Sequence, residues 1–254
     1  MYSQDSNNEL QVCLIATRRP EILEITLDSF NRNLFKNFNI KNFFANLDPV
    51  FGDAAQHKST KECIRDYFPN AVIHEPAEAS FGHAVKWAWG QFGSGLALHL
   101  EDDWKLNENV APQDVYNKLK PGYSAVTLCG NHKKWYKRRS YLWVGCRRTS
   151  FPYLGVTKVA ALGTQPKFIS GTFAYALSKL IDPNLDPEKQ MLPHINPAFS
   201  ELIKNNKCGF LDASGSKTYG VLTDLGRVWR EQRGIVKVIE DGKSIWTKGE
   251  NNQL

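Results

Sequence analysis

The sequence predicts an α/β protein built on a doubly wound, mostly parallel sheet flanked by helices. Two observations lead to this prediction. Short apolar segments alternate with segments of helical periodicity over residues 10–106. The fourth apolar segment, within Leu96–Leu106, then ends abruptly in three consecutive carboxylates, Glu101, Asp102 and Asp103. The carboxyl ends of parallel strands open into the ligand crevice of such sheets, so we expect a functional site there.

The elements of this first half follow from their patterning. The strands preceding Leu96–Leu106 are expected at Leu10–Thr17, Ile40–Leu47 and Ala71–His74, and the helices at about residues 21–33, 59–68 and 81–92. Pro20 suits the first turn of the first helix. Ser59 or Thr60 predicts the N-cap of the second helix. The common glycine-rich fingerprints for NAD and for P-loop nucleotides are absent from the sequence.

The second half, residues 107–254, is less periodic, and we expect it to be irregular and to share a single domain, residues 1–254, with the first half. Its expected elements are a strand at Tyr123–Cys129, a hairpin strand at Tyr141–Val144, an apolar, glycine-interrupted segment at Phe168–Leu177 and a short helix at Pro197–Asn205. The polar last residues, Glu240–Leu254, are expected to fray.

Composition narrows the class of protein. Apolar residues make up 42% and charged residues 23%, as in soluble globular proteins. The polar start, Met1–Leu10, is unlike a secretory signal, and no apolar run is long enough for a membrane helix. Five scattered cysteines without C-x-x-C spacing argue against a zinc site and a disulfide framework. A reducing cytoplasm is therefore expected, which would be the host cytoplasm for a viral protein.

The net charge of +6 is unevenly distributed along the chain. Residues Val115–Ile181 contain 12 Lys or Arg and no Asp or Glu, which leaves 20 basic against 26 acidic residues elsewhere, a balance of −6. Such asymmetry indicates a polyanionic partner.

Three features resemble the GT-A class of nucleotide-sugar glycosyltransferases, in particular its family 2-like members. They are V-C-L-I-A-T-R-R-P at the first strand, Asp48 after the second, and the strand ending L-E-D-D-W. The resemblance covers residues 10–106 and implies a Rossmann-like, GT-A-type donor half followed by an acceptor half. In that class the acidic cluster binds Mn²⁺ or Mg²⁺ and, through it, the diphosphate of a donor that is most often a UDP-sugar. The cluster here begins with Glu101 in place of Asp.

The resemblance also implies roles for individual residues. Asp103 would bind the metal ion, with Asp224 as a second ligand. The implied donor-binding residues are Ala16, Thr17, Arg18, Asp48, Glu101 and Asp102. The chemistry of the leaving diphosphate adds Arg227, or alternatively Arg230, because positive side chains stabilise its negative charge. Structural roles remain open for some of them: Arg18 as a surface charge and Asp48 as a turn cap.

An inverting reaction would also need a carboxylate that accepts the acceptor's proton. Glu188 matches the family's position best, and Asp182 and Asp186 are rivals. A solvated turn carboxylate is the alternative interpretation of Glu188.

The basic segment suggests the acceptor. In Asn131–Arg148, seven Lys or Arg alternate with aromatic residues, which suits phosphates and stacked bases. The acceptor-contacting candidates are Lys133, Lys134, Trp135, Tyr136, Arg138 and Arg139. The favoured hypothesis is transfer to a hydroxymethylated base in DNA, as in some bacteriophage enzymes, with the base flipped out of the duplex. The alternatives are the same chemistry on a cell-surface glycan, capsule or lipopolysaccharide, and a non-catalytic nucleic-acid-binding module.

Overall fold

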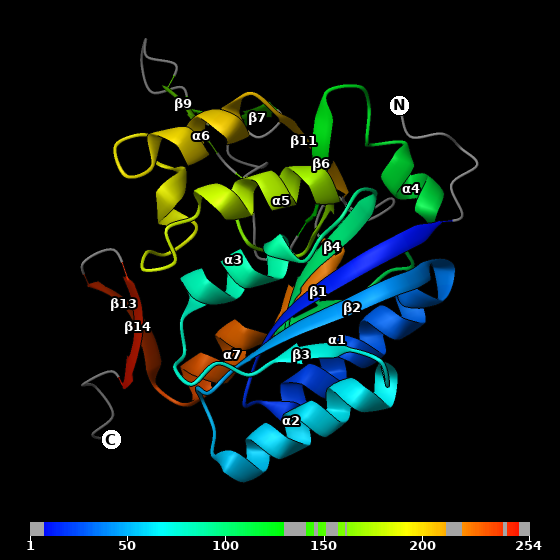
Figure 1. The fold of residues 1–254 in the computed structure, drawn as a ribbon, viewed down its shortest axis with the longest axis vertical. Helices are drawn as coiled ribbons and strands as arrows, with labels where there is room; N and C mark the ends of the chain where they lie inside the picture. The colour runs from blue at the N-terminus through cyan, green and yellow to red at the C-terminus, as the bar shows by residue number, and fades with distance from the viewer. Residues whose placement is uncertain are drawn as a thin grey trace.

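The computed structural model describes residues 8–129, 141–144, 147–150, 157–160, 162–211, 220–240 and 243–248. A seven-stranded sheet lies between two layers of helices (Figure 1). Its order is β11-β6-β10-β4-β1-β2-β3, with β1 at Glu9–Thr17, β2 at Asn39–Asp48, β3 at Val72–His74, β4 at Leu96–Glu101, β6 at Tyr123–Leu128, β10 at Lys167–Ser170 and β11 at Lys207–Leu211.

Helices cover both faces of the sheet. Those of the described residues are α1 (Pro20–Asn33), α2 (Ala54–Tyr67), α3 (Phe81–Gly90), α4 (Pro112–Tyr116), α5 (Gly171–Leu180), α6 (Pro197–Lys204) and α7 (Leu225–Gln232), with 3-10 turns η1 (Phe35–Asn37) and η3 (Lys189–Met191). Figure 1 shows α1 and α2 against one face, and α3, α5 and α6 on the other.

Three smaller sheets complete the described structure. They are β5 (Trp104–Leu106) with β12 (Leu222–Asp224), the hairpin β13 (Ile235–Glu240) with β14 (Lys243–Lys248), and β7 (Tyr141–Val144) with β8 (Arg147–Ser150) and β9 (Thr157–Ala160). The hairpin expected at Tyr141–Val144 is confirmed by the antiparallel pairing of β7 with β8.

The predicted fold class is confirmed, with one exception to parallel pairing. Strand β1 pairs in parallel with both β2 and β4, and β6 pairs in parallel with β11. Strand β10 lies between β4 and β6 and is antiparallel to both. Strands β4 and β6 therefore run in the same direction. The amino end of β6 therefore lies at the opposite end of the sheet's strands from the carboxyl end of β4.

Successive side chains of β1 point to opposite faces of the sheet and belong to two different hydrophobic cores. Leu10, Val12 and Leu14 belong to the core beneath α1, whereas Cys13 and Ile15 belong to the core beneath α3, α5 and α6. All five are buried. A strand with helices on both faces is apolar throughout, which explains the continuous apolar run in the sequence.

Element boundaries in the first half match the predictions except at α2. This helix begins at Ala54, and its N-cap is Asp53 rather than Ser59 or Thr60. The Asp53 side chain accepts a hydrogen bond from the Gln56 backbone N–H, and the Gln56 side chain accepts one from the Asp53 N–H. This capping box satisfies two backbone N–H donors at once, so the helix begins before Ser59 and Thr60.

The structure resolves one segment to which the sequence assigned no element type and corrects one expectation in the second half. The segment Phe168–Leu177 is divided between β10 and α5, with α5 beginning at Gly171. Part of the tail expected to fray, Lys243–Lys248, forms β14 and pairs along its length with β13. Packing explains the difference, because Trp246 of β14 lies with its ring 5.5 Å from that of Phe51.

Two further properties concern the whole described part of the chain. None of its helices is long and apolar enough to cross a membrane. The cysteines placed there, Cys13, Cys63, Cys129 and Cys208, carry free thiols.

The start of α5 gives a testable prediction. A Cβ atom at Gly171 would lie 2.0 Å from the carbonyl oxygen of Gly93. Because this oxygen belongs to the backbone, no side-chain rotation can relieve the clash. We expect Gly171→Ala to lower the free energy of unfolding by about 1–3 kcal/mol, measured by urea denaturation. In the control Gly90→Ala, the new Cβ would meet only the Ser178 Oγ at 3.6 Å. That helical substitution should be neutral or stabilise by up to about 1 kcal/mol. Equal stability of the two variants would contradict the close contact at Gly171.

Candidate active site

A cavity of about 470 Å³ opens at the carboxyl ends of the central strands. Thr17, Asp48 and Glu101, the last residues of β1, β2 and β4, all line it. The lining residues are Ile15, Thr17, Arg19, Asp48, Val50, Phe51, Ala79, Ser80, Phe81, Glu101, Asp102, Asp103, Trp104, Thr164, Glu188, Asp224, Arg227, Arg230, Lys237 and Trp246. This is the position at which α/β sheets bind ligands.

Asp102 joins the ends of β1 and β4. Its Oδ2 accepts hydrogen bonds from the backbone N–H and the hydroxyl of Thr17, both at 2.8 Å. Its Oδ1 accepts one from Arg19 Nη2 at 2.6 Å. Its backbone oxygen accepts a further bond from the Thr26 hydroxyl on α1 at 2.7 Å. Because Asp102 is 2% exposed and both carboxylate oxygens bind protein donors, it holds the cavity floor in place.

Arg19 is the buried counter-ion of the acidic cluster. It is 3% exposed, and its Nη2 also contacts Asp103 Oδ2 at 3.2 Å. Burial alone would lower the pKa of the guanidinium, but the charges of Asp102 and Asp103 more than offset this and raise the pKa. One positive charge thus forms ion pairs with two adjacent carboxylates.

Aromatic rings enclose the same guanidinium. Its central carbon lies 5.1 Å from the centroid of the Phe51 ring and 5.2 Å from the Trp229 ring. The two rings meet edge to face at 5.5 Å. Phe51 has φ +70°, a conformation that a bulky side chain adopts only when its surroundings impose it. In this conformation the Phe51 ring lies against Arg19 at the cavity wall.

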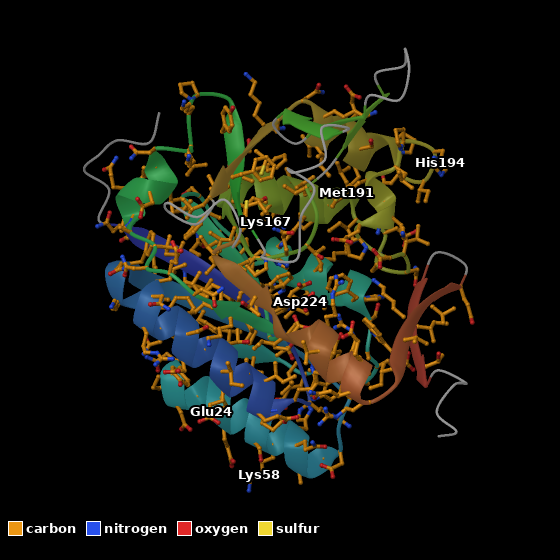
Figure 2. The ribbon with its side chains drawn as sticks, turned by 180° about the vertical axis from the view of Figure 1, so that it is seen from behind. Glu24, Lys58, Lys167, Met191, His194 and Asp224 are labelled. Carbon is orange, nitrogen blue, oxygen red and sulfur yellow. The ribbon has the colours of Figure 1, made fainter. Side chains whose placement is uncertain are left out.

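Asp103, which follows β4 in the chain, contacts the first residues of α7. Its backbone oxygen accepts the Leu225 N–H at 2.8 Å, and its Oδ2 lies 3.4 Å from Arg230 Nη1. A Cβ atom at Gly226 would lie 1.9 Å from this Oδ2, so only glycine permits the approach. Asp224, labelled in Figure 2, is the last residue of β12 and caps α7 by accepting the Arg227 N–H.

The carboxylates of the cluster affect one another electrostatically. Burial raises the pKa of Asp103, and the charges of Asp102 and Asp224 add to the rise against Arg19 and Arg230. Burial also raises the pKa of Glu101 to about 8, assisted by the charges of Asp103 and Glu188. Burial therefore favours the protonated form of Glu101, although Trp104 Nε1 donates a hydrogen bond to its Oε2 at 2.9 Å.

Glu188 lines the cavity from the second half of the chain, just before η3. Its Oε1 accepts two hydrogen bonds from Thr164, one from the backbone N–H at 2.9 Å and one from the hydroxyl at 3.0 Å. The side chain is exposed rather than buried in the core. A carboxylate held in this way and still accessible is suited to accept a proton from a bound hydroxyl.

The two rivals of Glu188 have other partners. Asp186 is buried, and its carboxylate binds the Glu188 and Lys189 backbone N–H groups and Lys237 Nζ, the last at 3.0 Å. Asp182 is exposed, accepts the Asn184 N–H within a turn and is not among the cavity-lining residues.

The remaining predicted donor residues divide into two groups. Asp48 lines the cavity, where burial raises its pKa, and accepts a hydrogen bond from Asn46 Nδ2 at 2.8 Å. Ala16 and Arg18 are not among the lining residues. Ala16 belongs to the core beneath α1, and Arg18 donates to His57 Nδ1 and the Gly52 oxygen.

The basic residues that line the cavity come from outside the predicted cationic segment: Arg19, Arg227, Arg230 and Lys237. Within that segment, Lys118 and Lys120 precede β6 at the opposite edge of the sheet, and Lys167 is fully buried. Lys133, Lys134, Trp135, Tyr136, Arg138 and Arg139 lie outside the described residues.

The described part of the chain contains no group of three or more His, Cys, Asp or Glu side chains arranged to hold a metal ion. Asp103 and Asp224 are close enough for the charge of Asp224 to raise the pKa of Asp103. Both line the cavity, and Asp103 Oδ2 is shared between Arg19 and Arg230.

The lining residues that the sequence prediction missed include Arg19, Phe51, Thr164 and Lys237. Arg19 is the N-cap residue of α1, directly before Pro20, but this position does not distinguish it from Arg18 as a cavity-lining residue. No local pattern marks the others, since packing between remote segments brings them to the cavity.

Comparisons with known proteins support the fold. No protein-family profile matches the sequence. No curated protein sequence matches it either. Among solved structures, the mannosyltransferase PcManGT from Pyrobaculum calidifontis, in complex with GDP-Man and Mn²⁺, is similar with a TM-score of 0.52 and 10% identity over 89% of this chain. S. aureus TarS 1-349 is similar with a TM-score of 0.53 and 13% identity over 85% of this chain.

The chain spans 60% of the length of each of these two structures. A complex of TarS 1-349 with UDP-GlcNAc is also similar, with a TM-score of 0.52 and 13% identity, covering 84% of this chain and 57% of that one. These likenesses confirm the predicted GT-A-type architecture.

The raised pKa of Glu101 predicts how stability depends on pH. Between its ordinary value of 4.5 and about 8, the folded state binds more protons than the unfolded state. This residue therefore makes stability fall as pH rises through that window and then level off. We expect Glu101→Gln to reduce the drop in Tm between about pH 5 and about pH 8.5 in metal-free buffer. The exposed control Glu62→Gln on α2 should leave the drop unchanged, and an unchanged drop in Glu101→Gln would contradict the burial of this charge.

Proposed function

We propose that this protein is a glycosyltransferase that moves a sugar from a nucleoside diphosphate, favoured as a UDP-sugar, to an acceptor hydroxyl. The observation that carries the proposal is the cavity itself. Asp48 at the end of β2 and the acidic cluster at the end of β4 line it together with Arg227 and Arg230 of α7, and Glu188 lines it from the second half of the chain. The GT-A-type fold supports the same reaction by analogy.

The cavity offers a different environment for each part of a sugar nucleotide. Asp48 ends β2 and Phe51 follows it, and both would border the nucleoside. Arg227 and Arg230 on α7 would face the diphosphate, since guanidinium groups bind phosphate oxygens in a bidentate manner. Such positive charge stabilises the negative charge that develops as the nucleoside diphosphate leaves.

A divalent cation, Mn²⁺ or Mg²⁺, fits these residues if it is bound together with the donor. Mg²⁺ typically takes one or two protein carboxylates and completes its shell with water and substrate phosphates. Asp103 and Asp224 would be those carboxylates, and the repulsion between them favours a cation at their side of the cavity. When bound, the cation would act as a Lewis acid toward the diphosphate.

Glu188 would act as the general base in an inverting reaction. The acceptor oxygen forms a bond to the anomeric carbon while the bond from that carbon to the phosphate oxygen breaks. The acceptor's proton passes to Glu188, whose Oε1 is already held by Thr164. Asp186 is less suited to this role, because it is buried and paired with Lys237.

For the acceptor we propose DNA carrying a hydroxymethylated base. The support is the sequence pattern of Asn131–Arg148, in which aromatic side chains are interleaved with groups of cationic ones. Cations bind phosphates, and aromatic rings stack on an extruded base. A cell-surface glycan, capsule or lipopolysaccharide acceptor, and binding of nucleic acid without catalysis, are the outcomes against which this proposal is tested.

Transfer assays test the function and the acceptor together. Radiolabelled UDP-glucose, UDP-GlcNAc and GDP-mannose would be incubated with unmodified DNA, hydroxymethylated DNA and a capsule polysaccharide. We expect label on hydroxymethylated DNA alone, reduced at least about tenfold when Lys133, Lys134, Arg138 and Arg139 are neutralised together, because phosphate contacts supply much of the affinity. Label on the polysaccharide alone would overturn the DNA acceptor. DNA binding without transfer from any donor would favour the non-catalytic module.

The metal proposal is tested by binding rather than by activity. We expect Mn²⁺ to strengthen the binding of UDP in calorimetry at least about tenfold, and we expect Asp103→Asn and Asp224→Asn to abolish this increase. The control is Asp182→Asn, which changes an exposed carboxylate away from the cavity and should preserve the increase. An undiminished Mn²⁺ effect in Asp103→Asn would rule out this residue as the ligand.

A further inference from the structure

We infer that Thr164 is a positioning residue that fixes the carboxylate of Glu188, and that residues 163–167 form a rigid platform for this purpose. The inference rests on the proposed role of Glu188 as the base. It adds to that role a reason why an exposed carboxylate on a turn would keep a single orientation.

The contacts of Glu188 are asymmetric. Both hydrogen bonds from Thr164, at 2.9 Å and 3.0 Å, reach the same oxygen, Oε1. Thr164 is 6% exposed, whereas Glu188 is exposed, so a fixed residue holds an accessible one. A free glutamate side chain gives up about 1.5–2 kcal/mol of rotational entropy when it is ordered. Thr164 orders it in the resting protein, before a substrate is bound.

The platform is rigid because a buried ammonium group binds its carbonyls. Lys167 is fully buried (Figure 2), and its Nζ donates to the Gly163 oxygen at 2.9 Å and the Gln165 oxygen at 2.6 Å. The Gln165 side chain donates to the Leu128 oxygen on β6, and the Leu128 N–H donates to the Pro166 oxygen. Residues 163–167 are thereby tied to the central sheet on either side of Thr164.

The backbone of Glu188 is held from the other side. Asp186 Oδ1 accepts the Glu188 N–H at 2.8 Å, and Asp186 Oδ2 accepts Lys237 Nζ at 3.0 Å. The turn that carries Glu188 is therefore fixed by Asp186, and the carboxylate by Thr164. Two-point fixation matters for a base, because a misplacement of about 1 Å can cost about 100-fold in rate.

The test compares Thr164→Val with Thr164→Ser. Valine has a similar size but removes the hydroxyl, and serine restores it. With the donor and acceptor that give transfer in the assays above, we expect Thr164→Val to lower kcat about tenfold with the donor KM unchanged, because the backbone N–H at residue 164 remains. Thr164→Ser should regain most of kcat. The control Thr172→Val, on the exposed start of α5, should match the unchanged protein.

A crystal structure of Thr164→Val supplies a readout that does not depend on activity. We expect the Glu188 carboxylate to leave its position or lose order, while residues 163–167 stay in place. If Glu188 keeps its position, or if kcat stays unchanged while Glu188→Gln is inactive, the positioning role of Thr164 is wrong. If Glu188→Gln retains full kcat, the base assignment fails instead, and the crystal structure still decides whether Thr164 orients this side chain.

Discussion

The ion pair between Arg19 and the carboxylates of Asp102 and Asp103 is the interaction on which the rest of the site depends. An uncompensated carboxylate in a protein interior costs several kcal/mol, and here two adjacent carboxylates follow one strand. Arg19 compensates both, at 2.6 Å and 3.2 Å. Because Asp102 also binds Thr17, the same contact joins β1 to β4 where the cavity opens. Phe51 and Trp229 close around the guanidinium and bring the β2 loop and α7 to the same point.

Most acidic and most basic side chains of the cavity come from different parts of the chain. Four of the six acidic lining residues, Asp48, Glu101, Asp102 and Asp103, come from strand ends in the first half of the chain. Three of the four cationic lining residues, Arg227, Arg230 and Lys237, come from the last described segments. Trp246 on β14 links two of these cations, lying 5.0 Å from the Arg230 guanidinium and 5.8 Å from Lys237 Nζ. The C-terminal hairpin is thus part of the site.

The sequence was informative where structure is local. Alternating strands and helices, and the carboxylates at the end of β4, follow from periodicity and turn residues, so the fold class and the acidic cluster were predicted from the residues themselves. Asp48, Glu188 and Asp224 were named only through the resemblance to a family. Contacts between remote segments were not. Nothing near Thr164 indicates that it binds Glu188, and the choice between Arg18 and Arg19 depends on the geometry at the end of β1. The basic segment shows a related limit, because composition alone does not separate the buried Lys167 from surface charge.

The antiparallel strand β10 constrains how the chain is made. Strands β1 to β4 are contiguous in sequence, but the partner that covers the outer edge of β4 arrives only after residues 107–166 have been synthesised. Until then, the apolar strand Leu96–Glu101 presents unpaired backbone groups along that edge. Open edges of this kind pair readily with strands of other chains. A fragment that ends near Leu106 would lack β10 and keep the edge of β4 open. By pairing with this edge, β10 of the second half protects the first half from aggregation.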